Sequence, residues 1–155
     1  MDKIDYQILE TIQRNFPLHE NPYAVIAADL GISVDQLFTR IKALKHSGVI
    51  RRLGLSLDSR KLGYVSTLCA VSVKPDRLDQ AAEFIGAFAE VTHSYQRDSE
   101  FNIWFTLITE SKDSIKKILT QIQEHLDLTD AQIMDVPVEK LFKLDARFKV
   151  SGPTK

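Results

Sequence analysis

Cysteine is almost absent from this sequence: its 155 residues include only one, Cys69, which lies inside an apolar run. A single cysteine provides neither an intrachain disulfide nor the paired ligands of a CxxC metal site. We expect Cys69 to be a buried side chain of a strand. The sequence also has no P-loop, GxGxxG, HExxH or GxSxG motif, so the enzyme classes that carry these motifs have no support.

Long apolar segments and a basic excess are missing as well. No run approaches the roughly 20 apolar residues of a membrane helix, and the first residues, Met-Asp-Lys-Ile-Asp, lack the apolar core of a signal peptide. We therefore predict a cytoplasmic protein with no membrane partner. The 20 Lys and Arg residues and 21 Asp and Glu residues give a net charge of −1, which argues against a protein that works on DNA.

The N-terminal part of the chain is predicted to form three short helices. Apolar residues recur at helical spacing over residues 5–14, 23–30 and 34–46. Gly31 supplies a tight turn and Ser33 a natural N-cap, so the second and third helices form a helix-turn-helix. Apolar residues then alternate toward the end of residues 50–57, which predicts a strand. We assign residues 1–57 to a helix-turn-helix domain with a linking strand.

The remaining residues, 58–155, are predicted to form a second domain with the order strand, helix, strand, strand, helix, strand. This is the order of the ferredoxin-like split β-α-β fold, so the chain is predicted to be α+β. The strands are expected at residues 64–73, 91–97, 101–109 and 131–138, and the helices at residues 76–88 and 111–126. The tail, residues 141–150, is a candidate for an added edge strand.

The segment that predicts function lies in the second expected strand. His93, Tyr95 and Arg97 occupy every second position, so in a strand their side chains share one face. An imidazole, a phenol and a guanidinium are costly on a core face, but they suit a pocket that handles protons and anions. His93 could donate a proton or bind a metal, or it could be a strand histidine that hydrogen-bonds a carbonyl. Trp104 is interpreted as packing under the sheet or at a subunit interface, with stacking on a flat ligand as the alternative.

Several cations lie near the predicted junction of the two domains. Arg51 and Arg52 directly follow the third helix, and Arg60 and Lys61 lie in the connection to the second domain. They could be solvated surface groups, or they could bind a ligand with several carboxylates, because guanidinium groups make bidentate contacts with carboxylates. The third helix has few cations for DNA phosphates and an acid near its start. Its exposed polar residues are Asp35, Gln36, Thr39, Arg40, Lys42 and Lys45.

The two-domain order resembles the Lrp/AsnC family, in which a helix-turn-helix precedes a ferredoxin-like ligand-sensing domain. Residues 2–9, Leu30-Gly31-Ile32-Ser33 and Gly48-Val49-Ile50 fit its N-terminal pattern. A narrower branch, the siroheme decarboxylases, fits better, and its motifs are spread over almost the whole chain. They are Gly48-Val49-Ile50-Arg51-Arg52-Leu53-Gly54, Arg60-Lys61-Leu62-Gly63-Tyr64, the run from His93 to Thr106, and Pro137-Val138-Glu139-Lys140-Leu141-Phe142-Lys143.

This resemblance implies an enzyme built on a regulator architecture. The family removes CO2 from the C12 and C18 acetate side chains of siroheme to give 12,18-didecarboxysiroheme, in the alternative haem pathway or in haem d1 synthesis. The carboxylates would be bound by Arg51, Arg52, Lys61 and Arg97, with Trp104 also in the substrate site. His93 would donate the proton with help from Tyr95, or it would be an axial ligand of the tetrapyrrole iron. No organic cofactor is required, because the conjugated ring can delocalise the electron pair.

One position departs from the branch pattern. The resemblance implies a His-x-Tyr-x-Arg-x-His run, but this chain has Ser99 at the second histidine position. We therefore expect a homologous second subunit that retains this histidine, which makes the chain one half of a heterodimer and nearly inactive alone. Two other functions stay open from the residues: a ligand-responsive Lrp/AsnC transcription factor, and a haem sensor without catalysis.

Overall fold

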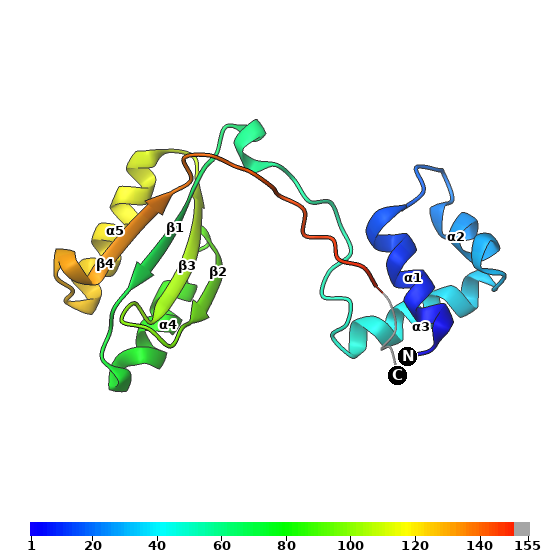
Figure 1. Cartoon of the computed structure of the whole chain (residues 1–155), viewed down its shortest axis with the longest axis horizontal. Helices are drawn as coiled ribbons and strands as arrows, with labels where there is room; N and C mark the ends of the chain where they lie inside the picture. Colours follow the sequence, from blue (N-terminus) through cyan, green and yellow to red (C-terminus); the bar gives the residue numbers. More distant parts are fainter. Residues whose placement is uncertain (151–155) are drawn as a thin grey trace. The chain divides into compact units, whose positions relative to one another are not determined.

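The chain folds into two compact units, and the computed structural model describes residues 1–150 (Figure 1). Residues 1–55 form the helical unit and residues 56–142 the sheet unit, so the division lies close to the boundary predicted after residue 57. Residues 143–150, which we expected in the second domain, group with the helical unit, and the last five residues of that expected domain lie outside the described residues. The backbone amides of Phe148 and Val150 donate hydrogen bonds to the side chains of Gln13 and Glu10.

The helical unit contains the three predicted helices, which are α1 (Lys3–Arg14), α2 (Pro22–Leu30) and α3 (Val34–His46). Gly31 ends α2 in the left-handed region with φ 66°, a conformation that glycine adopts without steric cost. Ser33 then caps α3, and its hydroxyl and the Gln36 side chain satisfy each other's backbone amides. Ile8, Ile26 and Leu37 are fully buried where the helices meet. The predicted helix-turn-helix is therefore confirmed.

The predicted linking strand is wrong, because residues 50–57 form no strand in the structure. Leu55 and Leu57, which suggested a strand through their alternation, are 83% and 69% exposed. Alternation shows only that a segment could lie at a sheet surface, whereas a strand also needs a partner for its backbone hydrogen bonds. No strand within residues 1–150 pairs with this segment, and the tail at residues 141–150 likewise forms no edge strand.

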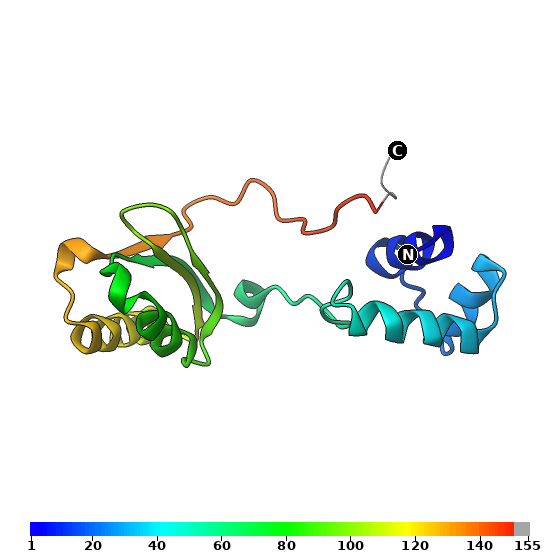
Figure 2. The ribbon, with the colours of Figure 1, turned by 90° about the horizontal axis from the view of Figure 1, so that it is seen from below.

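The sheet unit contains a four-stranded antiparallel sheet in the order β2-β3-β1-β4 (Figure 1). The strands are β1 (Val65–Val71), β2 (Val91–Gln96), β3 (Ile103–Thr109) and β4 (Ile133–Pro137). The helices α4 (Leu78–Gly86) and α5 (Lys112–Leu126) cover one face of the sheet and leave the other face open (Figure 2). The predicted ferredoxin-like order of strands and helices is confirmed.

The core of the sheet unit lies between the sheet and the two helices. Alternate residues of β1 and β3 point into it, including Cys69, Val71, Phe105 and Leu107, each at most 1% exposed. Within residues 1–150, no helix combines the length and the apolar character that crossing a bilayer requires. The prediction that Cys69 is a buried strand residue is confirmed, and burial, followed by the nearby charge of Asp135, raises the pKa of its thiol to about 12.

Cys69 should therefore resist thiol reagents in the folded protein. A native pKa of about 12, against the ordinary 9.0, lowers the thiolate fraction at pH 8 by roughly a thousandfold. Above pH 9 the unfolded thiol loses its proton while the native thiol keeps it, so the free energy of unfolding falls as the pH rises. Labelling with a chromogenic disulfide at pH 8 should be slow in buffer and complete in denaturant. Rapid labelling of the native chain would show that this part of the core opens readily.

Candidate functional site

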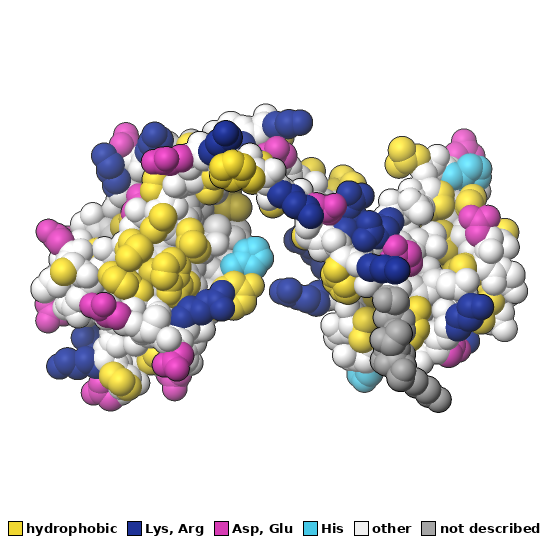
Figure 3. Space-filling model, viewed as in Figure 1, with side chains coloured by type: hydrophobic (Ala, Val, Ile, Leu, Met, Phe, Trp, Pro, Cys, Tyr) yellow, Lys and Arg dark blue, Asp and Glu magenta, His cyan; other side chains and the backbone are white. Residues whose placement is uncertain are grey.

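The open face of the sheet is built from two rows of side chains that cross all four strands. Strand register places His93, Thr106, Leu68 and Val136 in the first row. The second row contains Tyr95, Trp104, Ala70 and Met134. Directly opposed residues of paired strands present their side chains on the same face. Figure 3 shows hydrophobic side chains gathered over this face of the sheet unit, with cations and a histidine at the margin of the patch.

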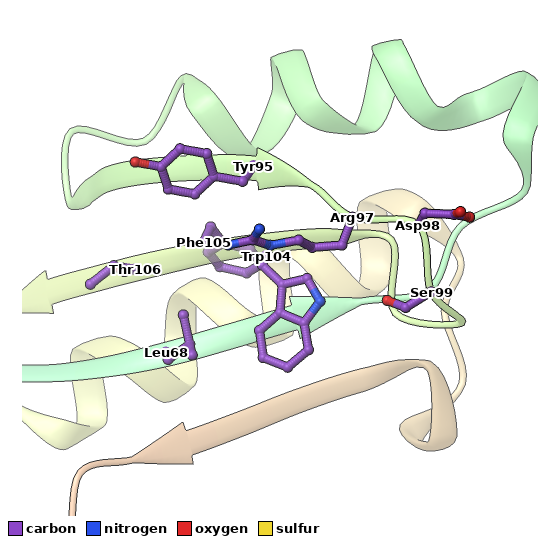
Figure 4. Close-up of a pocket in the computed structure, with 8 residues that line it drawn as sticks. All are labelled: Leu68, Tyr95, Arg97, Asp98, Ser99, Trp104, Phe105 and Thr106. Carbon is purple, nitrogen blue, oxygen red and sulfur yellow. The ribbon is translucent and has the colours of Figure 1, made fainter. Parts of the chain in front are cut away.

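A depression of about 560 Å³ lies on this face, toward the turn that joins β2 to β3. Its lining combines apolar and charged groups from three strands and that turn (Figure 4). The lining residues are Leu68, Tyr95, Arg97, Asp98, Ser99, Trp104, Phe105 and Thr106. A surface with a large apolar floor and a guanidinium at its edge suits a flat ligand that carries acidic groups.

The predicted stripe of His93, Tyr95 and Arg97 is brought together in the structure. The rings of His93 and Tyr95 are nearly parallel, at an interplanar angle of 19°, with their centroids 6.3 Å apart. The guanidinium carbon of Arg97 lies 5.7 Å from the centroid of the Tyr95 ring, within the range of a cation–π contact. Tyr95 and Arg97 line the depression, whereas His93 lies on the same face beside Tyr95.

Among the described residues, 1–150, the imidazole of His93 has one defined polar contact, between Nδ1 and the Thr92 hydroxyl at 3.0 Å. The same hydroxyl can donate to the Thr106 carbonyl at 3.5 Å. If the hydroxyl donates to Thr106, Nδ1–H donates to the hydroxyl and Nε2 carries a lone pair. If the hydroxyl donates to Nδ1, Nε2 carries the proton. The direction of the Thr92 hydroxyl therefore decides which tautomer His93 adopts, and so whether its Nε2 can donate a proton or bind a metal.

Trp104 lies on the open face and so does not pack under the sheet. Its indole Nε1–H donates a hydrogen bond to the Phe101 carbonyl at 2.8 Å, which fixes the orientation of the ring. Ala70 is its partner on β1, and this small side chain leaves room for the indole to lie over the sheet. A fixed, half-buried indole beside Arg97 can provide a flat apolar surface for a planar ligand.

The other predicted cations lie in other segments of the chain. Arg51 and Arg52 are exposed residues of the helical unit that follow α3. Lys61 is exposed and lies in a short 3-10 helix, Ser59–Leu62, of the sheet unit. Its neighbour Arg60 contacts Asp58 at 3.4 Å, which reduces its availability to a ligand. The sheet unit therefore contributes Arg97 to the depression, and Arg51, Arg52 and Lys61 remain predicted ligand contacts.

The polar side chains of α3 are partly engaged within the helical unit. Arg40 binds the carboxylates of Asp2 and Asp5 at 2.9 and 2.7 Å. The Asp5 amide and then Arg40 lower the pKa of Asp2, which keeps this carboxylate charged beside the guanidinium. Thr39 donates to the Asp35 carbonyl, and Gln36 is part of the α3 cap. These contacts leave fewer groups of α3 available to read DNA bases.

Sequence reasoning missed several residues of the depression. It left Asp98 in the connection between two expected strands, considered Ser99 only as the position of the second histidine that the resemblance implies, and did not assign Leu68 or Thr106 to the site. The alternation of β1 and β3 was a signal for which residues share a face, but the register between the strands decides which of them meet. Within residues 1–150, no three His, Cys, Asp or Glu side chains converge as a metal site.

Comparison with known proteins gives two family matches that together cover most of the chain. Residues 61–143 match the AsnC-like ligand binding domain, and residues 5–51 match the siroheme decarboxylase NirDL-like HTH domain. The chain is 41% identical over 152 residues to the siroheme decarboxylase alpha subunit of Desulfovibrio desulfuricans, covering 98% of this chain and 86% of that protein. It is 33% identical to the siroheme decarboxylase NirG subunit of Stutzerimonas stutzeri, covering 97% and 100% of the two chains.

Two solved structures are similar to this chain, one in sequence and fold and the other in fold alone. The crystal structure of the siroheme decarboxylase NirDL in co-complex with an iron-uroporphyrin III analogue matches with a TM-score of 0.67 and 32% identity. This match covers 86% of the present chain and 44% of NirDL, so the chain corresponds to about half of that protein. E. coli AsnC matches with a TM-score of 0.78 and 21% identity over 95% of this chain and 97% of AsnC, which supports the fold alone.

Proposed function

Because the chain belongs to the siroheme decarboxylase family, we propose that it is a subunit of an enzyme that removes CO2 from siroheme. The reaction converts the C12 and C18 acetate side chains to methyl groups and yields 12,18-didecarboxysiroheme. The observation that carries the proposal is the stripe of His93, Tyr95 and Arg97 beside an apolar depression on the open sheet face. The partner is a homologous second subunit, and the proposed location is the cytoplasm.

Substrate binding is assigned to the groups that match the chemistry of siroheme. A tetrapyrrole is flat and apolar at its centre and carries carboxylates around its rim. Trp104 offers a surface for the ring, and Arg97 at the edge of the depression offers a bidentate contact to a rim carboxylate. Arg51, Arg52 and Lys61 are proposed as partners for the other carboxylates.

The proposed reaction needs a proton donor to form the new methyl group. When the bond between the acetate methylene and its carboxylate breaks, CO2 leaves and the electron pair remains on the methylene carbon. The conjugated ring delocalises this pair, so the proposal includes no organic cofactor. A proton then forms the new C–H bond, and we assign its delivery to Nε2 of His93, with Tyr95 beside it. In the alternative tautomer, the lone pair of Nε2 would bind the tetrapyrrole iron instead.

The direct test is to mix the purified chain with siroheme without oxygen, with and without its second subunit, and to measure the mass of the tetrapyrrole. A decarboxylase produces a species lighter by two CO2 units. A shifted Soret band without mass loss would instead indicate a haem sensor. If neither change occurs and the chain shifts DNA in a salt-dependent manner, the chain acts as a regulator.

Arg51 and Arg52 test the assignment of the carboxylate contacts. Alanine at either position should weaken siroheme binding by about tenfold, because one charge-assisted hydrogen-bonded pair is lost. Binding can be followed by the Soret shift during titration. Arg60→Ala is the matched control, since Asp58 already engages its guanidinium, and it should retain the wild-type affinity. Wild-type affinity in both Arg51→Ala and Arg52→Ala would show that this pair is only a solvated surface feature.

A further inference from the structure

Asn102 ties the β2–β3 turn, residues 97–102, to the end of β1. Its side-chain Oδ1 accepts a hydrogen bond from the Val73 amide at 3.1 Å, and its Nδ2 donates to the Val73 carbonyl at 2.7 Å. Its backbone amide donates to the Val71 carbonyl at 3.0 Å. Three hydrogen bonds from one residue therefore hold the turn against the last residue of β1 and against Val73, which lies 29 positions away in sequence.

The same turn carries the groups at the edge of the depression. The Asn102 carbonyl accepts a hydrogen bond from the Arg97 amide at 2.9 Å, which closes the turn at its first residue. The neighbouring Phe101 carbonyl accepts from the Trp104 indole at 2.8 Å and from the Ser99 hydroxyl at 2.5 Å. Figure 4 shows that Arg97, Ser99 and Trp104 approach the depression from this turn and from the start of β3.

Asn102 itself does not line the depression. Any effect on a bound ligand must therefore pass through the backbone that Asn102 fixes. If the turn shifted away from β1, the Phe101 carbonyl would move away from the indole of Trp104, and the backbone of Arg97, which is hydrogen-bonded to Asn102, would move with the turn. A displacement of even a fraction of an ångström matters for a bidentate guanidinium contact, because its two hydrogen bonds need defined geometry.

We propose that Asn102 is a positioning residue that sets the placement of Arg97 and Trp104 and thereby the affinity for the carboxylate-bearing tetrapyrrole. The inference rests on the proposed function for the identity of the ligand. The claim that Asn102 fixes the indole of Trp104 does not depend on the ligand, and it can be tested on the chain without ligand.

The test uses the full chain, in which Trp104 is the only tryptophan and so reports on this site alone. Asn102→Ala removes both side-chain hydrogen bonds, and Asn102→Asp keeps an acceptor for the Val73 amide while losing the donor to the Val73 carbonyl. Thr109→Val is the matched control, because it removes a buried hydrogen bond to the Ser111 carbonyl at the opposite end of β3. Urea unfolding establishes which variants fold and how much stability each one loses.

Two signals are then measured: the near-ultraviolet circular dichroism of Trp104 in the free chain, and the quenching of its fluorescence by iron-uroporphyrin III. Asn102→Ala should change the dichroism and weaken binding by about tenfold, as expected when one charge-assisted contact is misplaced. Asn102→Asp should show smaller changes of the same kind, and it decides the question if the alanine variant does not fold. Thr109→Val should match the wild type in both signals.

Wild-type dichroism and affinity in the Asn102 variants would overturn the inference, as would an equal loss of affinity in Thr109→Val. If iron-uroporphyrin III binds neither the wild-type chain nor its assembly with the second subunit, the proposed function fails instead. In that case the dichroism of the free variants still decides whether Asn102 positions Trp104.

Discussion

Replacing His93 by alanine should lower siroheme turnover by at least about 100-fold, because general acid catalysis by a positioned side chain typically contributes that much or more. The imidazole is exposed, and its polar contact in the described part of the chain is with the neighbouring Thr92, so its removal should leave the fold intact. Turnover can be measured by mass spectrometry of the tetrapyrrole under anaerobic conditions. Urea unfolding of the same sample should give the wild-type midpoint.

The spectrum of the bound tetrapyrrole separates the two roles of His93. If the imidazole delivers the proton, His93→Ala should bind siroheme with an unchanged Soret band and fail only in turnover. If the imidazole ligates the iron, the Soret band of the complex should shift. His46→Ala is the control, since His46 lies in the last turn of α3 in the helical unit, and it should keep full activity. Full turnover in His93→Ala would remove this residue from the site.

Addition of the homologous second subunit should raise siroheme turnover by about 100-fold over this chain alone. The reason we propose lies at Ser99, where the resemblance to the family implies a second histidine. The Ser99 hydroxyl donates to the Phe101 carbonyl, and a serine does not titrate near neutral pH, so it cannot replace an imidazole as proton donor. A single chain then lacks one of two proton donors, each worth about this factor. The rates of both decarboxylations should be compared at equal chain concentration, with and without the partner.

Ser99→His provides the matched test of this explanation. Ser99 lines the depression beside Arg97, so a histidine at this position would reach the same ligand. The variant should raise the activity of the isolated chain. If the unmodified chain alone removes both CO2 groups at the rate of the assembly, the proposed sharing of proton donors between subunits is wrong.

Local sequence patterns predicted most of the fold, because the periodicity and capping residues of most elements lie within those elements. The helix-turn-helix followed from helical periodicity and from the turn at Gly31 and Ser33, whose conformations need no distant partner. The segment at residues 50–57 shows the limit of this reasoning. Its leucines alternate like those of a strand, but whether a strand forms depends on a pairing partner that the local sequence cannot specify.

The part of the candidate site that comes from one continuous segment was predictable, and the part that depends on contacts between strands was not. A period of two was enough to place His93 and Tyr95 on one face of β2, and Arg97, the first residue after that strand, lines the same depression as Tyr95. The contribution of Leu68 and the hydrogen bonds between Asn102 and Val73 depend on the pairing of β1 with β3, which brings together residues 29 or more positions apart. Such contacts follow from strand register, and register is a property of the assembled sheet.

The most direct test of the account is a crystal structure of this chain, assembled with its second subunit, with iron-uroporphyrin III bound. The account predicts that the macrocycle lies over Trp104 and Tyr95 on the open sheet face. One rim carboxylate should contact Arg97, and Nε2 of His93 should point at the ligand. A macrocycle bound elsewhere on the assembly, with His93 directed away from it, would contradict the central claim that this sheet face is the decarboxylation site.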